Sequence, residues 1–215
     1  MARILIIGGH GKIALLLEPL LAARGDDVTA VIRNPDHAAD VRDAGGTPLV
    51  FDIEAAGREA IAEVIAGHDA VVWSAGAGGG TPERTRAVDF EAAVRSMDAA
   101  ADAGVSRYVM VSYFGSSPQH GIPASNSFHA YAQAKADADE YLRSTALDWT
   151  VLAPSRLTFD APTGLIDVTS ENSDEVSRAD VARVIAGTLV EPATIRRTIR
   201  FNAGDQPIES ALREH

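Results

Sequence analysis

The N-terminal part of the chain joins a short apolar run directly to a glycine-rich turn. Ile4–Ile7 is continuously apolar, the turn Gly8–Gly11 follows at once, and an apolar-periodic segment begins near Ile13. A continuously apolar run of this length predicts a strand buried on both faces, and the periodicity after it predicts a helix. A tight turn needs only one glycine, so three glycines indicate that something approaches the backbone closely at this point.

The same alternation of short apolar runs with alanine-rich periodic segments continues along the chain. Strands that are repeatedly followed by helices form right-handed βαβ units, which predict a parallel sheet covered on both faces. We therefore expect an α/β fold of the Rossmann type, with a doubly wound, mostly parallel sheet. The expected strands are Ile4–Ile7, Val28–Ile32, Leu49–Phe51, Ala70–Trp73, Tyr108–Val111, Thr150–Leu152 and Thr198–Phe201, and the expected helices lie near Ile13–Ala23, Ala38–Ala44, Ala55–Ala66, Pro82–Ala103, Ala130–Ser144 and Arg178–Val190.

The glycine-rich turn matches two spacings of the dinucleotide-binding motif. Gly9, Gly11 and Ala14 give G-x-G-x-x-A, whereas Gly8, Gly11 and Ala14 give G-x-x-G-x-x-A. In both, the glycines let the backbone approach a pyrophosphate, and the helix N-terminus offers it N–H groups. A glycine-rich turn without a ligand is the alternative, but the position between the first strand and the first helix favours a dinucleotide. The loop residues expected at the cofactor are Gly8, Gly9, His10, Gly11, Lys12 and Ile13.

The end of the second expected strand indicates which dinucleotide is bound. An NAD-selective fold carries an acid about 20 residues after the glycine loop. Here Val28–Ile32 ends in Arg33, and no acid follows before Asp36. Because Arg33 would attract a 2′-phosphate, the sequence favours NADP(H), with NAD possible; an exposed loop arginine is the alternative. Asp52, with its neighbour Ile53, is a candidate for contacting the adenine after the third strand.

A second group of residues indicates acid–base chemistry. Tyr131 and Lys135 are four residues apart, so on a helix they share one face. A nearby ammonium favours the phenolate, so we expect Lys135 to lower the pKa of Tyr131 and let it exchange a proton with a carbonyl or alcohol oxygen. Ser112, at the end of the expected strand Tyr108–Val111, could hydrogen-bond the same oxygen. Tyrosine and lysine at this spacing also occur on ordinary amphipathic helices, but beside a glycine loop they favour a catalytic site.

The motifs together resemble a known family. They are Gly8-x-x-Gly11-x-x-Ala14, Arg33-Asn34-Pro35, Phe51-Asp52, Ser74-Ala75-Gly76, Ala103-Gly104-Val105, Val111-Ser112, Tyr131-x-x-x-Lys135 and Pro154-Ser155-Arg156-Leu157. With them the chain resembles the short-chain dehydrogenase/reductase superfamily, in particular its atypical, compact NAD(P)H-binding group, which includes NmrA-like proteins, flavin and biliverdin reductases, and epimerase-like proteins. The resemblance implies that Ser74, Ala75 and Gly76 line the adenosine ribose. It also implies that Lys135 holds the nicotinamide ribose, and that Pro154, Ser155 and Leu157 lie near the nicotinamide.

These residues predict an NADP(H)-dependent oxidoreductase. Hydride would move to or from a small carbonyl, alcohol or conjugated substrate, with Tyr131 as acid or base, Lys135 orienting the cofactor, and Ser112 polarising the substrate oxygen. One alternative is a non-catalytic NAD(P) sensor of the NmrA type. Another is a flavin- or biliverdin-type reductase, which needs hydride transfer but not Tyr131, and an epimerase-like activity is also open. We expect residues 1–215 to form one NAD(P)-binding domain, with 154–215 contributing a small substrate-side region.

Composition narrows the partners and the location. The 215 residues carry a net charge of −11 and no cysteine, which argues against nucleic acid and excludes disulfides and thiolate metal sites. The six histidines are scattered without metal-ligand spacing, so no metal is expected. No apolar run reaches the roughly 18 residues of a membrane helix, and no signal peptide is evident. We expect a cytoplasmic monomer or homodimer that binds a small-molecule substrate.

Overall fold

The structure, a computed structural model, describes residues 1–78 and 81–214. Its strands are β1 Arg3–Ile7, β2 Asp27–Ile32, β3 Thr47–Val50, β4 Ala70–Trp73, β5 Arg107–Val111, β6 Asp148–Pro154, β7 Arg156–Thr158, β8 Leu165–Asp167, β9 Glu175–Ser177, β10 Arg197–Ala203 and β11 Gln206–Pro207. In this part of the chain, nine strands form one sheet in the order β11-β8-β10-β6-β5-β4-β1-β2-β3. The pairs from β3 across to β10 are parallel, and β8 and β11 extend the sheet in antiparallel fashion. The predicted doubly wound, mostly parallel sheet is confirmed.

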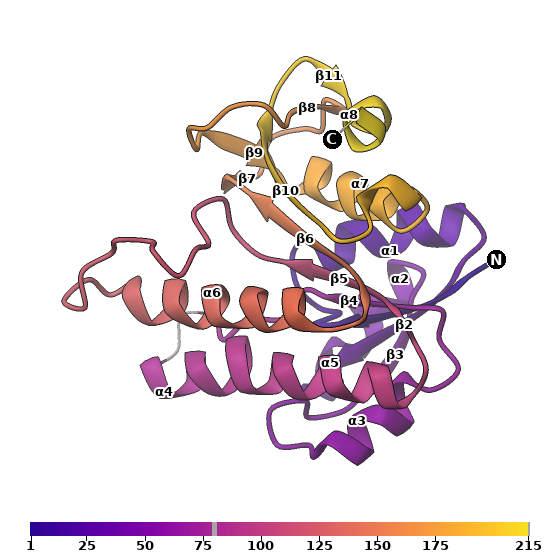
Figure 1. Ribbon diagram of the computed structural model, residues 1–215. Coiled ribbons are helices and arrows are strands. Elements are labelled where there is room, and N and C mark those ends of the chain that lie inside the picture. The colour runs from indigo at the N-terminus through magenta and orange to yellow at the C-terminus, as the bar shows by residue number, and fades with distance from the viewer. Residues whose placement is uncertain (79–80, 215) are drawn as a thin grey trace.

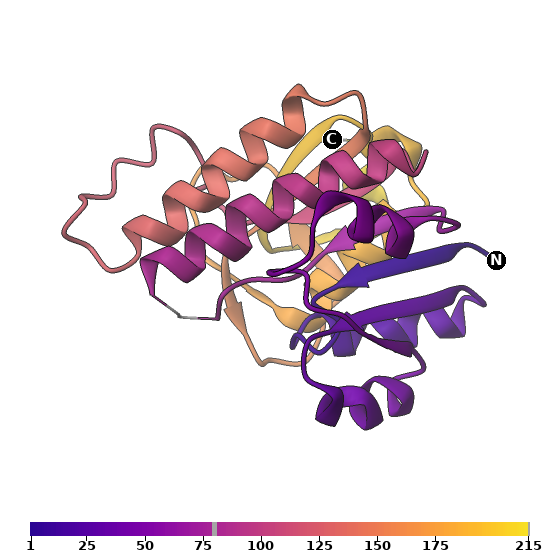
Figure 2. The ribbon, with the colours of Figure 1, turned by 90° about the horizontal axis from the view of Figure 1, so that it is seen from below.

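Helices cover both faces of this sheet (Figures 1 and 2). Their bounds are α1 Ala14–Ala23, α2 Ala38–Asp43, α3 Arg58–Ile65, α4 Pro82–Thr85, α5 Ala93–Asp102, α6 His129–Ser144, α7 Arg178–Thr188 and α8 Ile208–Glu214, with 3₁₀ turns at Pro35–His37 and Pro192–Thr194 and a π-helical segment, η2, at Arg86–Ala92. Among the described residues, no helix combines the length and apolar character needed to cross a membrane.

Alternate side chains of the central strands point into two main hydrophobic cores, one on each face of the sheet. Leu5 and Ile7 of β1 face the core beneath α3, α5 and α6, which includes Met97. Ile4 and Ile6 of the same strand face the core beneath α1, α7 and α8. Because successive side chains of a strand point to opposite faces, a continuously apolar strand is what a sheet covered on both sides requires.

Two regions differ from the sequence-based expectation. The predicted helix Pro82–Ala103 is divided into α4, the π-helical η2 and α5. No strand or helix was predicted between Pro154 and Ser177, but this stretch contains the three-residue strands β7, β8 and β9. Each of these pairs with a segment distant in the chain, and such pairing leaves no local periodic pattern. Ser177 caps α7, since the Asp180 N–H donates to Ser177 Oγ at 2.9 Å.

The order of the strands determines where a ligand would lie. The chain runs from β1 outward to β2 and β3, and then returns to place β4 on the other side of β1. At such a reversal the connections after neighbouring strands diverge to opposite faces, which leaves a crevice beyond the carboxyl ends of the strands. Gly8 follows β1 and Ser74 follows β4, so these two segments border the crevice.

Candidate functional site

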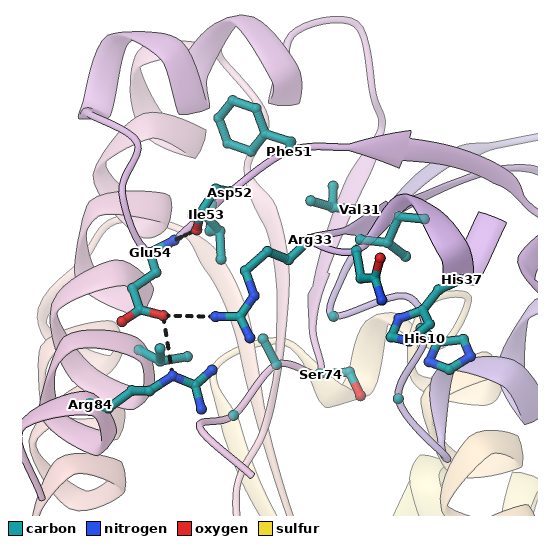
Figure 3. Close-up of a pocket in the computed structure, with 17 residues that line it drawn as sticks. His10, Val31, Arg33, His37, Phe51, Asp52, Ile53, Glu54, Ser74 and Arg84 are labelled. Atoms are coloured by element: carbon teal, nitrogen blue, oxygen red, sulfur yellow. Dashed lines mark hydrogen bonds and ion pairs between the residues drawn. The ribbon is translucent and has the colours of Figure 1, made fainter. Parts of the chain in front are cut away.

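A cavity of about 310 Å³ lies at this point of strand reversal (Figure 3). Residues from the ends of four different strands meet in it. The predicted cofactor-binding residues that line it are Gly8, His10, Gly11, Arg33, Asp52, Ile53, Ser74, Ala75 and Gly76. These residues belong to the segments after β1, β2, β3 and β4, and parallel strands bring such segments together because they end at one edge of the sheet.

The structure gives a different reason for each of the three glycines of the loop. Gly8 has a φ of +90°, and a Cβ there would lie 2.7 Å from the Ala75 backbone. A Cβ on Gly9 would lie 2.5 Å from the Ala30 side chain of β2, so Gly9 is needed for packing and does not border the cavity. Gly11 also lines the cavity, and its Cβ would lie 3.1 Å from the Gly8 carbonyl oxygen, the widest spacing of the three.

The backbone of the loop offers hydrogen-bond donors. The N–H groups of Gly9 and Gly11 are used within the fold, donating to Val31 and Gly8 carbonyls at 2.9 Å. Those of Lys12 and Ile13, just before α1, donate to none of the described residues. Unpaired N–H groups at a helix N-terminus suit the oxygens of an anion. The loop therefore fits a dinucleotide pyrophosphate.

Several of the predicted cofactor residues do not border this cavity. Ile13 is buried in the core, and the Lys12 ammonium lies 5.0 Å from the ring centre of Phe159. Ser155 is buried directly after β6. Pro154, Leu157 and Lys135 also lie outside the lining of this cavity. Their position outside this lining is compatible with the nicotinamide-side positions that the family resemblance implies.

Three charged side chains form a cluster on the cavity wall (Figure 3). The exposed Arg33 approaches Glu54 with an Nη1–Oε2 distance of 3.2 Å. Arg84, from α4, approaches the same carboxylate oxygen with its Nε at 3.4 Å. Sequence reasoning identified Arg33 but missed Glu54 and Arg84, because no local pattern links a residue of α4 to the end of β2.

Local contacts hold two further predicted residues. The N–H groups of Glu54 and Ala55 donate to Asp52 Oδ1, so Asp52 caps a turn at the edge of the cavity. His10 Nε2 lies 2.7 Å from an Asp40 carboxylate oxygen. Its ring stacks on His37 with a centroid separation of 3.6 Å, as Figure 3 shows. The two imidazoles form one wall of the cavity.

Tyr131 lies in the first turn of α6 and does not line the cavity beside the glycine loop. Its ring packs against Tyr113 and Phe128, with centroid distances of 5.7 and 5.1 Å. Burial raises the pKa of Tyr131 above that of a free phenol, and the charges of Asp89 and Asp139 raise it further. The prediction that this pKa is lowered is therefore wrong. The hydroxyl stays protonated at neutral pH, which suits a proton donor.

Lys135 is only 2% exposed, and its ammonium points to strand β5. Nζ donates to the Val111 carbonyl at 2.7 Å and lies 3.4 Å from Met110 Sδ. Burial lowers the pKa of Lys135, and the carboxylates of Asp139 and Asp89 oppose that change. These contacts explain why Lys135 does not lower the pKa of Tyr131: its charge is directed to the strand and to two buried acids.

The hydroxyl of Ser112 already donates a hydrogen bond within the protein. Ser112 Oγ and Ser116 Oγ each donate to Asp139 Oδ2 at 2.5 Å, and Asp139 is fully buried. The predicted use of Ser112 as a donor to substrate would therefore require this bond to break. Asp139 was missed in the sequence, although it follows Lys135 by four residues and so shares its helix face, which was the available signal.

Comparison with known proteins agrees with this geometry. The family model described as NAD(P)H-binding matches residues 8–192. The chain belongs to this NAD(P)H-binding family. Its first and last strands lie outside the matched range, but the glycine loop and the segments after β2, β3 and β4 lie within it.

Relatives of this NAD(P)H-binding protein span nearly its whole length. A UPF0659 protein of Saccharomyces cerevisiae is 31% identical, covering 98% of this chain and 97% of the relative. A Bacillus subtilis protein named as an uncharacterised sugar epimerase is 30% identical over 99% of both chains. A Bacillus halodurans structure, provisionally assigned as an NAD-dependent epimerase/dehydratase, superposes with a TM-score of 0.92 at 30% identity and full coverage of both chains.

More distant solved structures share the fold. An Escherichia coli anaerobillin reductase superposes with a TM-score of 0.79 at 24% identity, covering 94% of this chain and 98% of the other. Together with the matched family, these neighbours confirm the resemblance to the atypical short-chain dehydrogenase/reductase group. A nicotinamide dinucleotide is thus the cofactor class of the family to which the chain belongs.

The roomier position in the glycine loop yields a first prediction. We expect Gly11→Val to weaken NADP(H) binding by at least about 100-fold, roughly 3 kcal/mol, because the branched side chain would occupy the approach to the loop N–H groups. Gly57→Val is the matched control, since a Cβ at Gly57 meets nothing within 4 Å. Isothermal titration of both variants checks this. Unchanged affinity in a folded Gly11→Val would place the cofactor elsewhere.

Proposed function

We propose that this protein is an NADP(H)-dependent reductase of small carbonyl or conjugated compounds, with Tyr131 as the proton donor. The observation that carries the proposal is the pairing of two features at one edge of the sheet. One is a cavity of about 310 Å³ beside a glycine loop with unpaired N–H groups. The other is a tyrosine whose raised pKa keeps its proton at neutral pH. Membership of the NAD(P)H-binding family supports it.

The roles of the individual residues follow from their chemistry. The Lys12 and Ile13 N–H groups would hold the pyrophosphate, and Ser74 and Gly76 would border the adenosine ribose. When bound, the nicotinamide cofactor supplies the hydride. Tyr131 would give its proton to the substrate oxygen as negative charge develops there, which general acid catalysis requires. Because its phenol stays protonated, Tyr131 can serve as the acid that the reductive direction requires. Lys135 would keep the strand end and α6 in register beneath the nicotinamide ribose.

The segment from Pro154 onward is proposed to border the substrate side. It contacts the glycine loop through Phe159, whose ring lies 5.0 Å from the Lys12 ammonium and 4.1 Å from the Arg178 guanidinium carbon. Phe159 itself is 75% exposed, although two cations flank it. This contact with the glycine loop supports the proposal that the 154–215 region lies on the substrate side of one NAD(P)-binding domain.

The preference for NADP(H) rests on two arginines on the cavity wall. Arg33 and Arg84 share Glu54 as their only described acidic partner in the cavity, so the three side chains together carry one net positive charge. A 2′-phosphate would bring two negative charges close to both guanidinium groups. Charge-assisted hydrogen bonds of this kind are worth about 1.5 to 3 kcal/mol each.

We expect Arg33→Ala and Arg84→Ala each to weaken NADP⁺ binding by about 10- to 100-fold, while NAD⁺ binding changes by less than about threefold. Removing a guanidinium removes the phosphate contact but leaves the rest of the nucleotide site. Titration with both cofactors measures the ratio. Arg42→Ala, an exposed arginine of α2 outside the cavity, is the control. Equal losses for NADP⁺ and NAD⁺ would contradict a 2′-phosphate role.

The activity itself is tested by following NADPH absorbance with a panel of aldehydes, ketones, enones, flavins and tetrapyrroles. Oxidation of NADPH with a carbonyl substrate is the expected result. If only flavins or tetrapyrroles were turned over, the result would argue against proton transfer by Tyr131 and support direct hydride transfer to the acceptor. Tight cofactor binding without turnover of any acceptor would instead support a sensor of the NmrA type.

A further inference from the structure

A second cavity, of about 350 Å³, opens beside Tyr131. Ala77 and Gly78, which continue the segment after β4, form one side, and Phe128 and Tyr131 of the α6 region form another. Gly76, the preceding residue, lines the dinucleotide cavity, so the two cavities adjoin along one stretch of chain. The volume lies within the range of small-molecule sites. The proposed proton donor is therefore part of the wall of a ligand-sized space.

Asp89 also lines this second cavity, although only 1% of its surface is exposed. Its Oδ2 accepts the Ala77 N–H at 2.9 Å. Its Oδ1 has no hydrogen-bond partner among the described residues. A Cβ on Gly76 would lie 3.1 Å from that same oxygen, so Oδ1 lies under the segment that separates the two cavities. A buried carboxylate oxygen without a donor is unfavourable, and it marks a place where a ligand donor would be stabilised.

The backbone around Asp89 is unusual as well. Asp89 lies at the centre of η2, Arg86–Ala92, where the helix widens to π-helical hydrogen bonding between α4 and α5. Such segments are rare and frequently occur at functional sites. Burial raises the pKa of Asp89, and Lys135, the Ala77 amide and Arg84 counteract that rise. Asp89 therefore lies within electrostatic reach of Lys135 and Arg84.

We infer that the cavity beside Tyr131 is the substrate site and that Asp89 Oδ1 accepts a hydrogen bond from a substrate hydroxyl, so that hydroxy ketones and hydroxy aldehydes are selected. This inference rests on the proposed reductase function and adds the substrate class to it. The carbonyl oxygen would lie at the Tyr131 hydroxyl, and a hydroxyl on the neighbouring carbon would meet Asp89. Phe128, which lines the same cavity, would cover the carbon skeleton.

The reaction balances without a further reactant. The carbonyl carbon would gain a hydride, supplied by the reduced nicotinamide cofactor as it is oxidised, and the carbonyl oxygen would gain the Tyr131 proton, which water would restore. The hydroxyl at Asp89 is unchanged and serves only for recognition. A site that hydrogen-bonds a substrate hydroxyl discriminates strongly against an analogue that lacks it, because its buried polar group is then left unpaired.

Hydroxyacetone and 2-butanone test this inference, because they differ only in a hydroxyl in place of a methyl group. With NADPH, we expect the wild-type kcat/KM for hydroxyacetone to exceed that for 2-butanone by about 10- to 100-fold. Asp89→Asn keeps an acceptor for the Ala77 N–H but no second carboxylate oxygen, so the ratio should fall to near one. In Asp89→Asn loaded with NADP⁺, the saturation-transfer NMR signal of hydroxyacetone should be weaker than in the wild type.

Glu91→Gln is the matched control, since Glu91 lies in the same π-helical segment but is exposed and faces Arg86 at 3.3 Å. It should leave the ratio unchanged. Retention of the ratio by a folded Asp89→Asn overturns the inference and leaves the reductase proposal standing. So does equal turnover of both ketones by the wild type. Weaker NADP⁺ binding in Asp89→Asn with an unchanged ratio would assign the free oxygen to the cofactor, and absence of turnover with both ketones would rule out this substrate class.

Discussion

Tyr131→Phe is expected to lower kcat for carbonyl reduction by about 10²- to 10⁴-fold, the contribution of a positioned general acid. The change removes one oxygen and leaves the ring packed against Tyr113 and Phe128. NADP(H) affinity should therefore change by less than about threefold. Because burial and two nearby carboxylates raise the pKa of Tyr131, the wild-type reductive rate should also stay level as pH rises from about 6 to about 9.

Stopped-flow measurement of NADPH oxidation separates these effects from binding. Tyr141→Phe is the control: it makes the same change on the same helix, where the hydroxyl donates to Asp98 at 2.6 Å, outside both cavities. Tyr141→Phe should retain the wild-type kcat. Full activity of Tyr131→Phe with a true substrate would remove the proton-donor role and favour an acceptor that takes its proton from water.

Replacing Glu18 by glutamine or methionine is expected to stabilise the protein at neutral and alkaline pH. Glu18 is fully buried in α1, and neither carboxylate oxygen has a partner among the described residues. Burial raises its pKa from 4.5 to about 8. The folded state therefore retains a proton that the unfolded chain releases above about pH 4.5. Folding stability is full below that pH and falls by about 1.4 kcal/mol per pH unit until the folded-state pKa is reached.

Urea unfolding between about pH 5 and about pH 9 measures this slope. Near pH 8, both Glu18 variants should exceed the wild type in free energy of unfolding by roughly 3 to 5 kcal/mol, and their stability should fall less steeply with pH over the window. Glu63→Gln on the exposed face of α3 should keep the wild-type slope. A wild-type slope that persists in Glu18→Gln would mean that another group binds the proton.

Most of the secondary structure could be predicted because the local patterns are strong. The expected strand Ala70–Trp73 coincides with β4, and the expected helix Ala130–Ser144 differs from α6 by one residue at its start. Long periodic segments and buried apolar runs carry their own signal. The strands β7 and β9 were missed because each is three residues long and is defined only by pairing with the other. The π-helical turn at η2 likewise has no pattern that distinguishes it from an α-helix.

The sequence by itself determined the sheet, the glycine loop and the meeting of Gly8, Arg33, Asp52 and Ser74, because parallel strands in βαβ order must end at one edge. Only the tertiary structure decided how these groups are charged and paired. Lys135 has the predicted spacing from Tyr131, yet its ammonium meets the Val111 carbonyl, while burial raises the tyrosine pKa. Desolvation and contacts between distant segments, such as Ala77 with Asp89, depend on what surrounds a side chain in space. Residue spacing along a helix carries no information about the burial and the tertiary contacts of a side chain.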